Sequence, residues 1–461
     1  MKKNFIVFLV LLFLIIGNIG VFAGGGSETT TTEEPVEFEF WVSQTESDRL
    51  ATIKVIAETY MAMNPDITIK VISVEENDLP QNIQAAVSAG NIPPLLELGA
   101  ENAINFGSEG IIDLDMTLEL INDIGLNNFY KGALELVETP QKGTYYAVPF
   151  HGWVQGIWYR TDWFEEAGLE PPGTWETIEK AAEYFYDIDN NQYGILVGTT
   201  EENYTEQCFT QFAISNNARI FDKNGNVVFN SPEMREAVEY YTNLAKFNPP
   251  GPQTWRARDY YLQGKMAMFF YSTYIMDDLA ILENAAGSLT GDNFADLTGT
   301  DFDPDLADKT GFVPIISNTD DSSYGVIVAL ALTEQENEAV SQAARDFAKY
   351  LYTNDAYITW LHMAPGGMNP VLKGISDDPD FLNDPKGLYN NYGEEKMNEI
   401  ISGLSEIKRF GIVEGNVIEA YGDIFSQNII PQMIYKITQQ GMDIDSTMDW
   451  AESEIEKIVG N

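Results

Sequence analysis

Strand-like and helix-like patterns alternate directly after residue 35, and this alternation restricts the fold more than any other feature of the chain. Val36–Val42 alternates apolar and polar residues and is rich in aromatic and β-branched side chains, which is typical of a strand. Asp48–Met63 then carries apolar residues at helical spacing. The pattern continues with a strand at Ile67–Val74, a helix at Leu79–Ala89, a strand at Leu95–Leu98 and a further helix that starts at Ala103–Gly107. This order predicts an α/β fold with a mostly parallel sheet and helices on both faces.

The rest of the chain continues the mixture of strands and helices. We expect strands at Tyr145–Pro149, Gly156–Tyr159, Gly225–Phe229, Phe312–Ile316 and Val326–Leu332, and helices at Thr174–Tyr186, Pro232–Phe247 and Glu336–Tyr352. Thr174 and Ser231 are expected N-caps, and Pro232 follows Ser231 at the first helical position. Beyond Pro370 the pattern is mainly helical to Val459.

The first 23 residues have the pattern of a secretory signal peptide. Lys2 and Lys3 precede the apolar run Phe5–Ile16, and Val21-Phe22-Ala23 predicts cleavage after Ala23. An uncleaved anchor is the alternative, since Phe5–Ala23 is long enough to span a membrane. Residues 24–35 form a polar linker without a cysteine for a lipid anchor. We expect a periplasmic or otherwise extracytoplasmic protein.

The charge balance excludes some partners. The chain has 71 acidic and 26 basic residues, for a net charge of −45. Such a surface repels nucleic acids and anionic lipids, so we expect no nucleic-acid partner. Cys208 is the single cysteine, and only two histidines exist, so neither a disulfide nor a Cys/His metal site is expected. We expect no cofactor, and a buried structural role for the Cys208 thiol.

Several motifs occur in an order that is similar to a known family. They are Ala57–Val71 with its Asn-Pro, Ala89–Pro93 followed by Gly107–Leu114, the long stretch Tyr145–Ile178, Gly264–Met268, and Ala343–Tyr352 followed by Gly366–Pro370. Together they resemble the extracellular solute-binding proteins of ABC importers, within them most closely the carbohydrate-binding, maltose-binding-protein-like family. The usual Asp after Pro93 is Pro94 here, and Arg160-Thr161 replaces the usual Asn.

The resemblance implies a periplasmic-binding-protein-like fold of type II, in which discontinuous lobes are joined by a hinge. One lobe would comprise residues 36–149 plus 314–352, and the other 150–313 plus 353–461. The chain would cross between the lobes near Val148–Phe150, Lys309–Ile315 and Tyr352. Such a protein is expected to act as a monomer that binds a carbohydrate in the interlobe cleft. It would deliver that ligand to the transmembrane permease subunits of an ABC transporter.

The candidate binding residues combine flat rings with carboxylates and amides, which suits the faces and hydroxyls of a sugar. Polar side chains at or beyond the ends of the first and third strands are Gln44, Glu46, Glu97, Glu101 and Asn102. His151 can donate to or accept from a hydroxyl. By resemblance, Trp153, Tyr274 and Tyr421 fall at aromatic ligand contacts, and Glu206 falls at a carboxylate. For each residue the alternative is a structural or solvated side chain, and Trp360 is expected in the core.

Three alternative functions stay open. A secreted glycoside hydrolase would need two carboxylates about 5–10 Å apart, and acidic pairs arise easily in so acidic a chain. No nucleophile elbow, phosphate loop or dinucleotide motif is present in the sequence, so we expect no enzyme and no catalytic residues. A binding protein for a solute other than a sugar, and a structural or adhesive surface protein, are the remaining alternatives.

Overall fold

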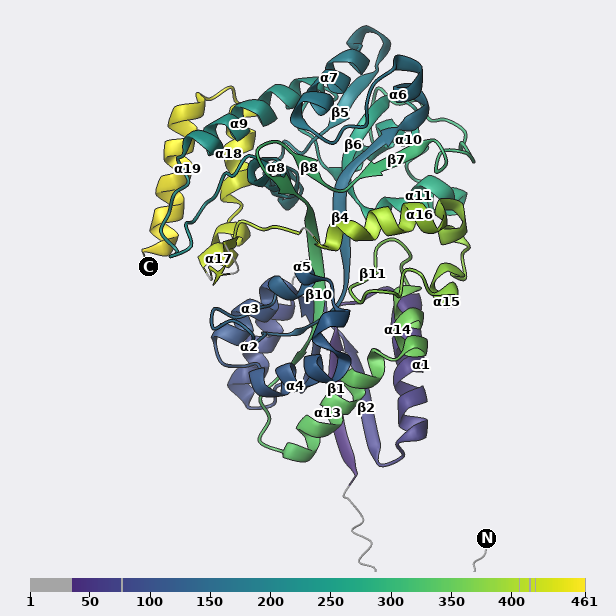
Figure 1. Ribbon diagram of the computed structural model, residues 1–461, viewed down its shortest axis with the longest axis vertical. Coiled ribbons are helices and arrows are strands. Elements are labelled where there is room, and N and C mark those ends of the chain that lie inside the picture. Colours follow the sequence, from purple (N-terminus) through teal and green to yellow (C-terminus); the bar gives the residue numbers. More distant parts are fainter. Residues whose placement is uncertain (1–34, 76–77, 406, 414–415, 419, 461) are drawn as a thin grey trace, which may run out of the picture. The chain divides into compact units, whose positions relative to one another are not determined.

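A mixed β-sheet runs through the molecule in the strand order β2-β1-β3-β10-β4-β6-β5, with β7 and β11 also paired to β4 (Figure 1). The computed structural model describes residues 35–75, 78–405, 407–413, 416–418 and 420–460. Residues Val36–Asn461 form one compact unit. The predicted signal peptide and all but Pro35 of the predicted linker lie outside the described residues.

The strands have the following bounds: β1 (Val36–Val42), β2 (Ile67–Ser73), β3 (Leu95–Gly99), β4 (Val148–Arg160), β5 (Tyr193–Leu196), β6 (Met266–Ser272), β7 (Thr310–Val313), β10 (Tyr324–Leu332) and β11 (Asn369–Pro370). Two short hairpins are β8 (Ile316–Ser317) with β9 (Asp321–Ser322), and β12 (Ile412–Val413) with β13 (Asn416–Val417).

The helices have the following bounds: α1 (Ser47–Met63), α2 (Leu79–Ala89), α3 (Ala100–Ser108), α4 (Leu114–Ile124), α5 (Lys131–Glu135), α6 (Thr161–Ala167), α7 (Trp175–Phe185), α8 (Asn203–Ser215), α9 (Pro232–Leu244), α10 (Arg258–Leu262), α11 (Met276–Ala280), α12 (Leu282–Ala285), α13 (Glu338–Leu351), α14 (Asn354–Leu361), α15 (Pro379–Leu382), α16 (Leu388–Ser402), α17 (Ala420–Ser426), α18 (Ile429–Thr438) and α19 (Ile444–Val459). The single turns Thr273–Ile275 and Gly403–Ser405 are 3₁₀-helical.

The two long strands β4 and β10 connect the lower and upper halves of the molecule in Figure 1. They pair antiparallel from Tyr324 opposite Gln155 to Leu330 opposite Val148. The prediction of separate strands at Tyr145–Pro149 and Gly156–Tyr159 is wrong, because the residues between them also pair with β10 and make one 13-residue strand. These two strands are the framework on which both halves are built.

The prediction of a mostly parallel sheet is correct only for part of the sheet. β1 pairs parallel with β2 and β3, and β5 pairs parallel with β6. β4 and β10 run in opposite directions between the halves, and all of their pairings in the sheet are antiparallel. Gly225–Phe229 is not a strand, since only an isolated bridge joins Phe221 to Val227.

Aromatic packing fixes the helices of the lower half on the sheet. Phe40 of β1 lies with its ring centroid 5.6 Å from that of Phe347 in α13 and 6.2 Å from Trp360 in α14. Trp360 is fully buried, which confirms its predicted place in the core. In the upper half Thr174 caps α7 and Ser231 caps α9, as predicted. Cys208 is fully buried in α8.

Two features are absent from the described residues. Within residues 35–75, 78–405, 407–413, 416–418 and 420–460, no helix is long and apolar enough to cross a membrane. In the same part of the chain, no group of three or more His, Cys, Asp or Glu side chains is arranged to hold a metal ion.

Candidate ligand-binding cleft

A cavity of about 710 Å³ lies between α3 of the lower half and α8 and α17 of the upper half. Trp153 of β4 and Tyr324 of β10 form part of its wall. Its polar lining consists of the side chains Gln84, Glu101, Asn102, Asn105, Glu109, Asn203, Gln207, Arg409, Asp423 and Ser426. Carboxylates and amides therefore provide most of the hydrogen-bonding groups, while Phe106 and Phe425 add apolar surface.

A second hollow of about 540 Å³ adjoins this cavity, because Trp153, Asn203 and Gln207 line both. Its wall contains an unusual share of aromatic rings, from Tyr204, Trp255, Tyr271 and Tyr274. We refer to the two cavities together as the cleft. Its concave shape and mixed lining are typical of a small-molecule site.

Trp153 and Tyr274, two predicted stacking residues, both line the cleft. Trp153 is half-buried, and its ring centroid is 6.1 Å from that of Tyr324. Tyr274 packs its ring over Gly367, where an added Cβ atom would lie 2.0 Å from the ring. A side chain at position 367 would therefore displace the Tyr274 ring, and only glycine leaves room for it. Both aromatic side chains are held in place and leave part of their surface open to a ligand.

Glu101 and Asn102 stand on the first turn of α3 and also line the cleft. Glu101 forms an ion pair with Arg409, which is only 4% exposed. Arg409 also donates to the carbonyl oxygen of Gly325 at 3.1 Å, and its guanidinium lies 4.7 Å from the ring centroid of Tyr324. Sequence reasoning missed Arg409, because it follows α16 in a segment without a strand or helix pattern.

Glu206 and Tyr421 form a buried pair beside the cleft. The Tyr421 hydroxyl donates to Oε1 of Glu206 at 2.8 Å, and Oε2 has no partner among the described residues. Burial raises the pKa of Glu206 from 4.5 to about 7, although Tyr421 and the charge of Arg409 oppose this shift. Tyr421 shares a small cavity of about 30 Å³ with Glu101 and Arg409. Glu206 itself does not line the cleft.

Three other predicted residues form a separate buried cluster instead of lining the cleft. Glu97 of β3 is fully buried and accepts from Ser43 N at 2.6 Å, Ser43 Oγ at 2.7 Å, Gln44 Nε2 at 2.9 Å and His151 Nε2 at 3.2 Å. Burial opposes ionisation of Glu97, but the hydrogen bonds from His151 and Ser43 outweigh it, so its pKa is lowered. These contacts join the ends of β1 and β3 to β4.

Glu46 lies apart from both groups. Its exposed side chain precedes α1 and forms an ion pair with Arg49 at 3.3 Å. The structure thus brings Glu101, Asn102, Trp153 and Tyr274 together along the cleft. Besides Arg409, sequence reasoning missed the cleft residues Asn105, Asn203, Gln207 and Asp423. This chain has many polar residues on its helices, and the sequence pattern does not distinguish those that line the cleft from those on the outer surface.

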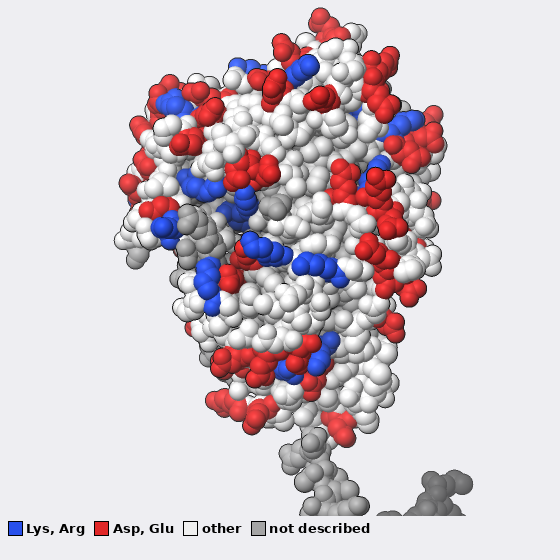
Figure 2. Space-filling view, in the orientation of Figure 1, with Lys and Arg blue, Asp and Glu red and all other residues white. Residues whose placement is uncertain are grey.

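The charges are unevenly distributed over the surface. Figure 2 shows acidic side chains over the upper and lower parts of the visible face and basic side chains gathered across its middle. Arg219, Lys223 and Lys408 line a further hollow of about 700 Å³. Asp320 lies between two of them, 2.9 Å from Lys408 and 3.9 Å from Arg219. The basic group is therefore partly neutralised locally.

Two half-molecules joined by crossing strands, with a polar and aromatic cleft between them, define the class of two-lobe, type II periplasmic binding proteins. Comparison with known structures supports this fold. The structure of the sugar-binding protein MalE from Xanthomonas citri aligns with this protein with a TM-score of 0.72 and 15% sequence identity. The alignment covers 92% of this chain and 98% of the MalE chain. A solute-binding protein from Thermotoga lettingae bound to α-D-tagatose aligns with a TM-score of 0.67 and 21% sequence identity. This alignment covers 92% of this chain and 99% of the Thermotoga chain.

The sequence comparisons identify the family. The chain belongs to the bacterial extracellular solute-binding proteins, whose family model matches residues 44–358. It is 28% identical over 451 residues to YcjN of Escherichia coli K12, described as an ABC transporter periplasmic-binding protein, with 98% of each chain covered. It is also 24% identical to the maltotriose-binding protein of Pyrococcus abyssi, over 82% of this chain and 75% of the relative.

Proposed function

We propose that this protein is the extracytoplasmic binding subunit of an ABC importer and that it holds a carbohydrate in the cleft without changing it chemically. The observation that supports this most is the lining of the cleft, where Trp153 and Tyr274 stand among carboxylates and amides. Rings bind the weakly polar faces of a sugar, and acceptors and donors bind its hydroxyls. Solved relatives of the same fold hold α-D-tagatose, maltose, ribitol and D-mannitol.

In this proposal the two lobes close around the ligand by bending at β4 and β10. Lobe 1 comprises residues 36–149 plus 314–352 and, because Trp360 packs on Phe40 of β1, also α14, whereas lobe 2 comprises 150–313 and the rest of 353–461. Glu101 and Asn102 come from lobe 1, whereas Asn203, Gln207 and Tyr274 come from lobe 2. A ligand that contacts both sets favours the closed arrangement by its differential affinity. The closed monomer then presents the surface that the permease subunits recognise.

The proposal assigns the other predicted residues different places around the ligand. Glu206 and Tyr421 support the wall of the cleft beside Arg409. The cluster of Gln44, Glu97 and His151 fixes the ends of β1, β3 and β4 on the lobe 1 side. Direct contacts of these five residues with the ligand stay predictions.

A thermal-shift screen tests the proposal. The panel contains maltose, maltotriose, α-D-tagatose, ribitol and D-mannitol. A sugar that binds the native state at 100 times its Kd stabilises it by about 2.7 kcal/mol, so the melting temperature must rise. If no panel member raises it while amino acids or peptides do, the solute is not a carbohydrate. Release of reducing sugar from a bound oligosaccharide would instead indicate a hydrolase.

A further inference from the structure

Arg409 occupies a position that neither the family resemblance nor the sequence pattern indicates. It lies where three cavities meet, because it lines the cleft, the small cavity beside Tyr421 and the basic hollow that contains Lys408. Among the described residues that line the 710 Å³ cavity, it is the only Lys or Arg. Its guanidinium is nevertheless almost completely buried.

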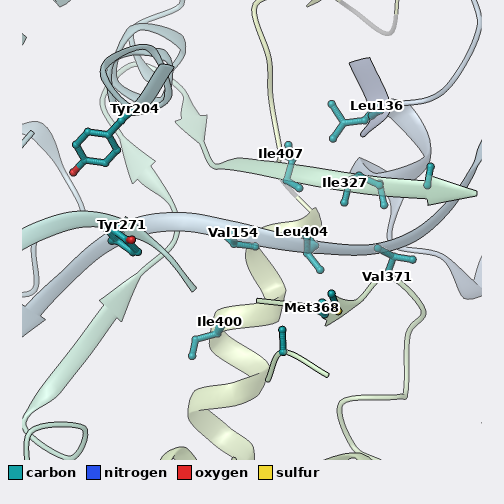
Figure 3. Close-up of a cluster of buried hydrophobic side chains, with 14 of the residues drawn as sticks. Leu136, Val154, Tyr204, Tyr271, Ile327, Met368, Val371, Ile400, Leu404 and Ile407 are labelled. Atoms are coloured by element: carbon teal, nitrogen blue, oxygen red, sulfur yellow. The ribbon is translucent and has the colours of Figure 1, made fainter. Parts of the chain in front are cut away.

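The backbone around Arg409 explains its orientation. Ile407 pairs with Ser323 in a parallel bridge, and Lys408 N donates to the Ser323 carbonyl oxygen at 3.0 Å. Figure 3 shows Leu404 and Ile407 beside Ile327 of β10 and Val154 of β4. The segment therefore packs against the two strands that join the lobes.

The polar contacts of Arg409 reach α3 of the lower half and the crossing strand β10. One is the ion pair with Glu101 on α3, and another is the hydrogen bond to Gly325 O on β10. The guanidinium also faces the ring of Tyr324 at 4.7 Å. Because α16 and α17, which flank the segment, both lie in the upper half, the ion pair connects the upper half to α3 below (Figure 1).

We propose that Arg409 is a positioning residue that ties the lobes together across the cleft and holds the Glu101 carboxylate facing the bound ligand. The second part rests on the proposed function, and the first does not. An arginine suits this role because its planar guanidinium can bind a carboxylate and a carbonyl at once. Arg409 would thereby make Glu101 a preorganised acceptor and would favour the closed arrangement before a ligand arrives.

The test measures lobe closure in the full chain without any ligand. Fluorescent labels are placed at Glu58→Cys on α1 and Glu183→Cys on α7, both exposed, while the buried Cys208 stays unlabelled. Single-molecule energy transfer then reports the ratio of closed to open molecules. We expect Arg409→Met to lower this ratio by about tenfold, since Arg409 itself is buried and losing one partner of a partly buried pair removes more than a surface contact does.

Matched variants distinguish a positioning role from general destabilisation. Lys408→Met removes the neighbouring cation, whose ion pair with Asp320 lies outside the cleft, and should leave the ratio unchanged. Arg409→Lys should restore part of the closed-to-open ratio that Arg409→Met loses. Glu101→Gln should lower the ratio of closed to open molecules as much as Arg409→Met does. The double variant of Arg409→Met and Glu101→Gln should lower it little further than either single substitution. If Arg409→Met is too unstable to measure, Glu101→Gln against Lys408→Met decides.

Two results would overturn the proposal. One is an unchanged ratio in Arg409→Met or Glu101→Gln, and the other is an equal loss in Lys408→Met. Because the readout needs no sugar, its failure is distinct from a failure of the carbohydrate screen. If the thermal-shift screen identifies a sugar, the Arg409→Lys variant should bind that sugar more tightly than the Arg409→Met variant does.

Discussion

The buried carboxylate of Glu97 gives a prediction whose size follows from its contacts. Oε2 accepts both hydrogen bonds from Ser43, and Oε1 accepts those from Gln44 and His151. In Glu97→Gln the amide oxygen must face Ser43, because a backbone N–H can only donate. The new NH₂ group then faces the Nε2 donor of Gln44, whose own oxygen is bound by Arg49 at 3.2 Å.

The expected loss is about 4 kcal/mol in the free energy of unfolding. The two hydrogen bonds from Ser43 would end on a neutral amide oxygen instead of a carboxylate, which weakens each by about 1 kcal/mol. The new NH₂ group facing the Gln44 Nε2 donor costs about 2 kcal/mol more. Urea unfolding at pH 7, followed by tryptophan fluorescence, measures this difference. Glu46→Gln is the matched control, because its exposed ion pair with Arg49 contributes less than about 1 kcal/mol.

The pH dependence checks that the ionised carboxylate is the cause. The pKa of Glu97 is lower in the folded protein than its ordinary value of 4.5. Its stabilisation is therefore complete above pH 4.5 and is lost as the pH falls through the lower, folded pKa. The difference between wild type and Glu97→Gln should shrink in that acidic range. A loss below about 1 kcal/mol at pH 7, or one that persists in acid, would refute the reasoning.

Four further predictions concern other residues. The pKa of Glu206 is raised to about 7, so Glu206→Gln should be more stable than wild type by about 2–4 kcal/mol at pH 8 and nearly equal to it at pH 4, as measured by urea unfolding. Burial raises the pKa of the Cys208 thiol to about 12, so Ellman's reagent should react with it only after denaturation. Trp153→Ala should weaken binding of a sugar from the screen by about 1–3 kcal/mol in calorimetry, whereas Trp163→Ala, outside the cleft, should not. A Cβ at Gly194 would lie 2.1 Å from the Ala182 carbonyl oxygen, so Gly194→Ala should lower the melting temperature and cost about 1–3 kcal/mol.

Much of the local structure could be predicted because it depends on neighbouring residues. The helix Leu79–Ala89 and the strand Val36–Val42 have the predicted bounds, and Thr174 caps α7 through the backbone N–H of Thr177. Apolar spacing and capping side chains act within a few residues, so the sequence shows them directly. The candidate site was only partly predictable, since Glu101 and Trp153 line the cleft but Glu97 and His151 bond to each other.

The pattern of residues along the chain indicates the class of fold, the family resemblance, and the caps and periodicity of most elements. Only the tertiary structure decided that one strand runs unbroken from Val148 to Arg160, and that Glu101 meets Arg409, 308 residues further along the chain. Glu206 and Tyr421 are likewise 215 residues apart. Such contacts depend on how distant segments pack, and no local spacing encodes which buried carboxylate receives which partner. The chemistry of the cleft is therefore a property of the folded chain.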